Sequence, residues 1–207
     1  YRMDKSMKQR PVEDLKDLNV RFFPEGGHLV EGIPSVVGFE TLSENSGWVN
    51  VNGYLLSESG ERILPVSTTH DGIGSFTYTP GEKPASVEIS YNGKTRRFKL
   101  PKAQPAGYGI TVNVREESLD VTVSRSPGMT GGDVALFLFS GLTPRTYVPV
   151  DFSGSDVRRI KILTADLPGG VVRLALVNSS GEPLLDRFCY VYPKDTLRLS
   201  ATADNDL

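Results

Sequence analysis

From Asn19 onward, apolar and polar residues alternate or form short apolar runs, and turn-forming residues separate these runs. A period of two is typical of strands, because successive side chains of a strand point to opposite faces. No stretch keeps the period of a helix over several turns, so the pattern predicts an all-β chain. The first half contains seven predicted strands, at 19–24, 35–42, 48–56, 62–68, 74–80, 86–91 and 95–100. The second half contains seven more, at 109–114, 119–124, 133–140, 146–152, 156–163, 170–178 and 184–192, with 196–200 as a further candidate.

Turn signals follow nearly every predicted strand, and the clearest is Asn92-Gly93. The type I′ turn, which matches the twist of a two-stranded ribbon, needs positive φ at both central residues, and Asn-Gly meets this need. Many short strands with such turns are typical of β-sandwiches. We therefore expect two tandem sandwiches of the Ig-like type.

The segment 101–107 is predicted to link the two sandwiches, because Pro101 and Pro105 favour an extended, semi-rigid chain without an apolar stripe. This places the first domain at 19–100 and the second at 108–200. Residues 1–18 are a charged lead-in, for which Pro11 leaves one or two helical turns as an alternative to a linker. Residues 201–207 form a polar tail.

Composition supports the prediction of an all-β chain and narrows the range of possible partners. Glycine (21) and proline (14) together make 35 of 207 residues, about 17% against roughly 12% in an average protein, as many turns require. The net charge is -2 and no long basic cluster occurs, so we do not expect a nucleic-acid partner. The longest apolar run, Val134 to Phe139, is far shorter than the roughly 20 residues of a membrane-spanning helix. The chain opens with Tyr1 and no leader-like segment, so we expect a piece of a longer protein.

The chain offers little catalytic chemistry. His28 and His70 lie in turn-like segments, and with Cys189 they fall short of a zinc ligand set. No Gly-x-Ser-x-Gly elbow occurs, and the glycine-rich 70–75 segment lacks the lysine and helix of a phosphate loop. The acidic segments 151–156 and 203–207 lack the spacing of a calcium loop. We therefore predict no catalytic, cofactor-binding or metal-binding residues, and no enzyme.

The aromatic residues are predicted to lie inside. Trp48 opens a predicted strand, where core packing is the common role. Phe76 and Tyr78 share one strand face, and Phe188, Tyr190 and Tyr192 share another. Each set is interpreted as an interior face, and not as an exposed platform for sugars. Cys189 lies within the second of these strands and is expected to be a buried thiol.

The segment 20–32 reads VRFFPEGGHLVEG. In a strand Phe22 and Phe23 point to opposite faces, so one is expected in the core and the other outside. Pro24 should end the strand, and Gly26 and Gly27 allow a turn with positive φ. We interpret the segment as an edge strand that opens a sandwich.

Three ordered motifs carry a resemblance to a known family. They are the 20–40 segment with FFPEGG, THDGIGSFTYTP at 69–80 with Asp71, Gly72, Gly74 and Phe76, and LPKAQPAGY at 100–108. With the closing RFCYVY, they resemble macroglobulin-like (MG2-type) β-sandwich modules of large Bacteroidetes envelope proteins, over about residues 19–200. The resemblance implies an extracytoplasmic setting, in the periplasm or at the outer membrane, and a long parent chain, often with TonB-receptor plug-like domains. It implies no enzymatic activity. The Cys-Gly-Glu-Gln thioester motif of true macroglobulins is absent, and no bait-like insertion is visible.

The leading hypothesis is a non-catalytic scaffold that spaces or docks other domains of the same polypeptide, or envelope proteins, in an outer-membrane-associated protein. Its role could include TonB-linked transport. One alternative is a module that binds glycans or peptides. The other is a macroglobulin-like fragment of a protease inhibitor.

Overall fold

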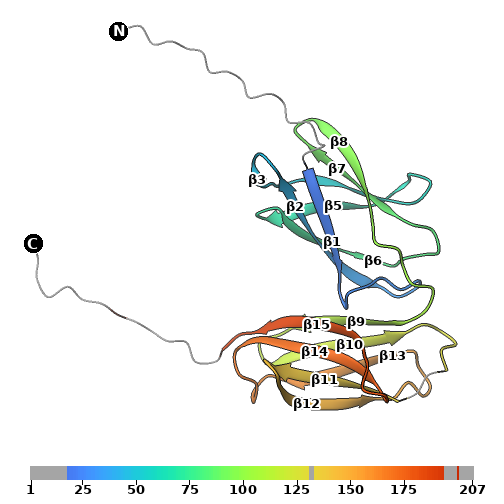
Figure 1. The fold of residues 1–207 in the computed structure, drawn as a ribbon, viewed down its shortest axis with the longest axis vertical. Helices are drawn as coiled ribbons and strands as arrows, with labels where there is room; N and C mark the ends of the chain where they lie inside the picture. Colours follow the sequence, from blue (N-terminus) through green and yellow to red (C-terminus); the bar gives the residue numbers. More distant parts are fainter. Residues whose placement is uncertain (1–17, 131–132, 194–199, 201–207) are drawn as a thin grey trace, which may run out of the picture. The chain divides into compact units, whose positions relative to one another are not determined.

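The computed structural model describes residues 18–130, 133–193 and 200. All secondary-structure elements named within these ranges are β-strands (Figure 1). The predicted all-β class is confirmed, and the fold consists of β-sandwiches. The predicted helical turns before residue 18 and the tail at 201–207 lie outside the described residues, as does the candidate strand 196–200 apart from Ser200.

The described residues form two compact units. Unit 1 runs up to Thr111 and includes Ser124–Thr130, and unit 2 comprises Val112–Val123 and the described residues from Asp133 on. The predicted domain boundaries at 100 and 108 stay predictions.

Unit 1 contains eight strands in the order β1-β2-β6-β5-β4-β7-β8, with β3 paired to β2. They are β1 (Leu18–Pro24), β2 (Ser35–Ser43), β3 (Gly47–Trp48), β4 (Asn52–Leu56), β5 (Arg62–His70), β6 (Ile73–Tyr78), β7 (Ser86–Tyr91) and β8 (Lys94–Lys99). Strand β5 joins two layers, because its first residues pair with β4 and its last residues, Thr68 and His70, pair with β6. A strand that changes sheets in this way closes the corner of a sandwich.

The predicted strand 48–56 is two strands, because the chain changes layers at Val49–Val51. The Val49 N–H donates to the Thr41 carbonyl of β2, and the Thr41 hydroxyl donates to the Val49 carbonyl, whereas Val51 pairs with Thr68 of β5. Both valines are buried by this crossing. Trp48 lies before it and is 50% exposed, so the prediction of a core tryptophan is wrong.

The core of unit 1 lies between its layers and collects the buried faces of β2, β4 and β7. Its fully buried side chains include Val37, Phe39, Leu55, Val87 and Ile89. The segment 101–107 packs beside residues 29–31. Val30 and Gln104 form a parallel bridge, and the Gln104 N–H donates to the Leu29 carbonyl at 2.8 Å.

Unit 2 contains a three-stranded sheet, β13-β10-β9, and a four-stranded sheet, β12-β11-β14-β15. Their bounds are β9 (Tyr108–Val114), β10 (Ser118–Arg125), β11 (Val134–Ser140), β12 (Thr143–Val150), β13 (Val157–Leu163), β14 (Gly170–Asn178) and β15 (Pro183–Val191). The division between the units crosses β9 and β10. The core collects alternate residues of these strands, among them Leu119, Leu136, Leu174 and Leu176.

Candidate interaction surface

The opening motif lies on the edge strand β1, in register with β2. Phe22 is half-buried and its ring lies 6.4 Å from that of Phe39, while Phe23 is exposed opposite Gly38. Strand β1 ends at Pro24, and Gly26 and Gly27 follow it with φ of 85° and 93°. This segment is therefore a strand end and a turn.

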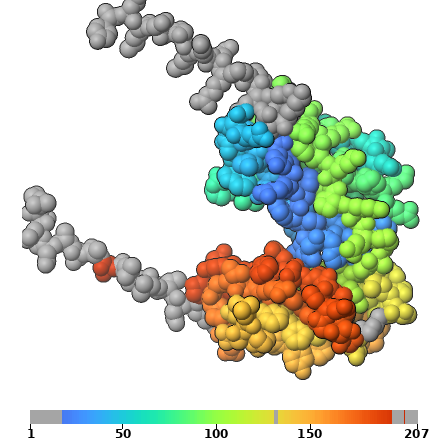
Figure 2. Space-filling model, in the orientation of Figure 1, coloured from blue at the N-terminus to red at the C-terminus, as the bar shows by residue number. Residues whose placement is uncertain are grey.

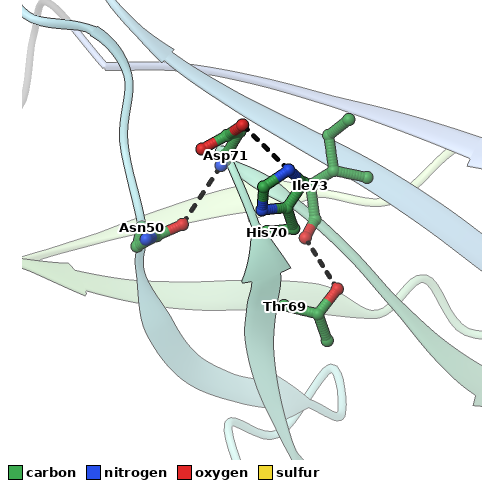
Figure 3. Close-up of polar contacts among 6 residues, drawn as sticks. Asn50, Thr69, His70, Asp71 and Ile73 are labelled. Carbon is green, nitrogen blue, oxygen red and sulfur yellow. Dashed lines mark hydrogen bonds and ion pairs between the residues drawn. The ribbon is translucent and has the colours of Figure 1, made fainter. Parts of the chain in front are cut away.

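The second motif forms a two-residue hairpin turn between β5 and β6 (Figure 3). Asp71 has φ 42° and Gly72 has φ 72°, the signs of a type I′ turn. The Gly72 N–H donates to the Asn50 side-chain oxygen at 3.1 Å, and the Thr69 hydroxyl donates to the Ile73 carbonyl at 3.2 Å. His70 lies 3.0 Å from the Asp71 carboxylate, with both side chains exposed to water. An exposed pair of this kind contributes little to stability.

Three motif residues converge on Phe39, which sequence reasoning did not single out. The Phe39 ring contacts Phe22 and lies 6.1 Å from the ring of Phe76. A Cβ atom at Gly74 would come within 2.6 Å of the same ring. Phe39 is one of several apolar residues in the predicted strand 35–42. Only the pairing of β2 with β1 and β6 therefore reveals its role. The motif residues thus build a core and a turn, whereas Pro101 and Pro105 lie exposed on the separate segment 101–107.

Metal-ligating side chains do not cluster in the part of the chain that the structure describes. It holds no group of three or more His, Cys, Asp or Glu that could bind a metal ion. It also contains no helix of the length and apolarity needed to cross a membrane. Cys189 is a buried thiol, as predicted.

Unit 2 carries the candidate interaction surface, on the outer side of its four-stranded sheet. Strands β14 and β15 lie at the molecular surface in Figure 2, in orange and red. Along β15, Cys189 and Val191 point into the core, and Phe188 and Tyr190, which alternate with them, point out. We call this outer side the aromatic face, and its most exposed members are Tyr147 (62%), Val171 (59%), Phe188 (55%), Tyr190 (49%) and Tyr192 (73%).

Strand register places aromatic side chains of β11, β12 and β15 on this face. Tyr147 of β12 lies opposite Phe137 of β11, and their rings are stacked with centroids 5.6 Å apart. Phe137 stacks in turn on Phe139 at 6.1 Å. Near the opposite edge of the same face, Tyr190 packs edge-on against Tyr192, with ring centroids 5.3 Å apart. Aromatic rings therefore extend from one edge of the sheet to the other.

Arg173 of β14 occupies the middle of the aromatic face. It lies opposite Phe139 on one side and Phe188 on the other. Its guanidinium carbon lies 6.0 Å from the centroid of the Phe139 ring, and its Nε is 2.9 Å from the Asp186 carboxylate. Arginine on an aromatic ring is a cation–π contact, and the ion pair holds the side chain across the sheet.

This composition is unusual for a sheet face turned to water. Antiparallel sheets normally place polar residues on their solvated side, and contiguous exposed apolar patches mark interaction sites. Aromatic residues and arginine are the types enriched where proteins bind one another. The prediction that Phe188, Tyr190 and Tyr192 face the interior is wrong. From Phe188 to Val191 the residues on both faces of β15 are apolar or aromatic, so alternation alone could not tell the inner face from the outer one.

No protein-family model and no curated protein matches the chain. Among solved structures it is similar to the native alpha-2-macroglobulin of E. coli, at 11% identity and a TM-score of 0.30. The match covers 91% of this chain and 16% of that one, so the chain spans about a sixth of the macroglobulin. A two-domain fibronectin type III segment of chicken tenascin matches at 17% identity and a TM-score of 0.30, over 85% of this chain and 97% of that one. The adhesin InvE of Yersinia pseudotuberculosis matches at 12% identity and a TM-score of 0.30, over 91% of this chain and 66% of that one.

Proposed function

We propose that the chain is a pair of non-catalytic β-sandwich modules that dock a protein partner through the aromatic face of unit 2. The observation that carries the proposal is the row of exposed rings around the Arg173–Asp186 pair. Burying such rings releases about 25 cal/mol per Å² of apolar surface removed from water. Their few rotatable bonds also keep the entropy cost of binding low.

The three motifs that resemble macroglobulin-like envelope modules suggest the setting and the partner. We place the modules outside the cytoplasm, in the cell envelope, as part of a larger protein. The partner is then another domain of the same polypeptide or a second envelope protein. Partial exposure of Arg173 and Asp186 suits such docking, because their polar atoms remain available at the middle of the interface.

Site-specific photocrosslinking in the cells that produce the protein tests this proposal. Benzoylphenylalanine replaces Phe188 or Tyr147 on the aromatic face, and Ile63 of unit 1, which is 48% exposed, serves as the matched control. We expect positions 188 and 147 to crosslink to the same protein or to the same segment of the parent chain, and position 63 not to do so. Equal crosslinking from all three positions, or none from 188 and 147, would overturn the docking role.

Glycan binding is a second candidate, because exposed aromatic rings beside hydrogen-bonding groups also suit sugars. Here Arg173 and Asp186 would supply the hydrogen bonds. A glycan array probed with the parent chain and with a Phe188→Ser/Tyr190→Ser variant separates the two candidates. Binding that the variant loses would favour the glycan, and the absence of binding at millimolar ligand would leave the protein partner.

A further inference from the structure

A pocket of about 250 Å³ lies in unit 1, between the loop after β6 and the segment after β8. Leu29, Ala85 and Leu100 line it and are buried, and Tyr78 lines it with a half-buried ring. The pocket belongs to a different unit from the aromatic face, so an inference about it goes beyond the proposed function.

Backbone hydrogen bonds hold the walls of this pocket in place. The Leu100 N–H donates to the Ala85 carbonyl at 3.1 Å, which ties the two walls together. The Gly32 N–H donates to the Pro80 carbonyl at 2.8 Å, so the 79–85 loop is also held against the segment around Gly32. Because these hydrogen bonds order the walls before a ligand arrives, binding does not carry the entropy cost of ordering them.

The floor of the pocket is apolar, with one polar group at its side. Burial raises the pKa of the Tyr78 phenol above its ordinary value of 10.0, against an opposing hydrogen bond with the Gly81 backbone. The phenol is therefore protonated at neutral pH and can donate a hydrogen bond.

The rim of the pocket is positive. Three lysines, Lys83, Lys99 and Lys102, stand there against one acid, Glu82. Lys83 pairs with Glu58 at 3.1 Å. Within the described ranges, Lys99 and Lys102 take part in no ion pair, so both ammonium groups beside the apolar floor are available to a negatively charged ligand.

We propose that this pocket binds an apolar group that carries a carboxylate. The apolar part would fill the space over Leu29, Ala85 and Leu100, and the carboxylate would lie between Lys99 and Lys102. The volume is below the range of about 300–1,000 Å³ that is usual for drug-sized ligands, so the occupant has the size of one large side chain. A small aliphatic or aromatic acid and the C-terminal residue of a peptide share this chemistry.

Two ligands that differ only in charge test the proposal, N-acetylphenylalanine and its amide, each titrated into ¹⁵N-labelled protein. We expect the acid to shift the amide resonances of Ala85, Leu100 and Ala103, and to bind about tenfold more tightly than the amide, as a charge-assisted hydrogen bond allows. Added salt should weaken the binding of the acid and leave the affinity for the amide unchanged. Equal affinity of acid and amide, or no shift at these residues, would overturn the proposal.

Charge variants show whether the two lysines bind the carboxylate. Lys99→Gln combined with Lys102→Gln should bring the affinity for the acid down to that for the amide. Lys94→Gln, at the other end of β8 and outside the pocket lining, is the matched control and should keep the preference. All three side chains are exposed, so folding is retained and circular dichroism verifies it. An equal loss in the control would assign the preference to general charge and refute the pocket.

The source of the carboxylate is distinguished by two further ligands. Tighter binding of N-acetyl-Gly-Gly-Phe than of 3-phenylpropionate would indicate a peptide end, and the reverse order a small acid, and either supports the pocket. Failure of both to bind overturns it. The Phe188→Ser variant of unit 2 should leave these titrations unchanged, so failure of the pocket and failure of the aromatic face are separate results.

Discussion

Gly72 and Gly93 have nearly the same backbone angle, φ 72° and 75°, in two-residue turns with different surroundings. A Cβ atom at Gly72 would lie 2.6 Å from the Thr41 carbonyl oxygen, whereas one at Gly93 would meet nothing within 4 Å. We expect Gly93→Ala to lower the free energy of unfolding by about 1 kcal/mol, from positive φ alone. Gly72→Ala should cost roughly 1–3 kcal/mol more, because the turn must also shift. Urea unfolding of both variants measures this, and equal losses would contradict the steric account.

Gly74 differs from these turn glycines, because its φ is not positive. A Cβ atom there would lie 2.4 Å from the Ser67 carbonyl oxygen and 2.5 Å from the Phe39 ring. We expect Gly74→Ala to lower the free energy of unfolding by about 1–3 kcal/mol through overpacking. Gly38→Ala on the neighbouring strand β2 is the control. Its nearest contact is an ordinary 3.6 Å, so the change should stay within about 0.5 kcal/mol. Thermal unfolding that ranks the two variants in the opposite order would refute the close approach at Gly74.

Tyr78 links the stability of unit 1 to alkaline pH. Its pKa is raised in the folded state, mainly by burial, so the folded state holds the phenolic proton more tightly than the unfolded chain does. This contribution to stability is complete below the unfolded pKa of about 10 and is lost as the pH rises through the folded pKa. Urea unfolding between pH 9 and pH 11 should show a steeper loss for the parent chain than for Tyr78→Phe. The same slope in both proteins would exclude Tyr78 as the source.

At the scale of elements, β15 separates the two sides of its sheet within a few residues. Tyr190 is exposed on the aromatic face, whereas Val191 is 4% exposed on the core side. We expect Val191→Thr to lower the free energy of unfolding by about 1–3 kcal/mol, because a hydroxyl is buried without a planned partner. Tyr190→Thr should stay within about 0.5 kcal/mol. Denaturant unfolding of the two variants measures this, and a larger loss for Tyr190→Thr would mean that the face is part of a core.

At the scale of the whole molecule, each unit has a buried core of its own. Ile89 of unit 1 and Leu174 of unit 2 are fully buried, and truncation of such residues to alanine costs about 2–5 kcal/mol. We therefore expect calorimetry to resolve two unfolding transitions, with Ile89→Ala lowering one and Leu174→Ala the other. A single transition that both variants lower equally would show that the chain unfolds as one cooperative block.

The local chemistry of the chain was sufficient to predict the strands and the turns. Period-two patterns located the strands of both units to within a few residues, with 48–56 as the exception. Asn92-Gly93 was identified as a type I′ turn, and φ is positive at both residues. These features depend on neighbours in sequence, through side-chain alternation and allowed φ, and so they can be predicted without the fold.

The orientation of an apolar face depends on partners that are distant in sequence. In β15, Cys189 and Val191 alternate with Phe188 and Tyr190, and all four are apolar enough for a core. Only the packing of β14 and β15 against the opposing sheet decides that the aromatic side faces water. The exposure of Trp48 likewise results from the layer change at Val49–Val51, which needs Thr41 and Thr68 of other strands. Neighbours along the chain therefore fix where strands and turns form, whereas the side of a strand that is surface depends on the assembled layers, because burial is a property of those layers.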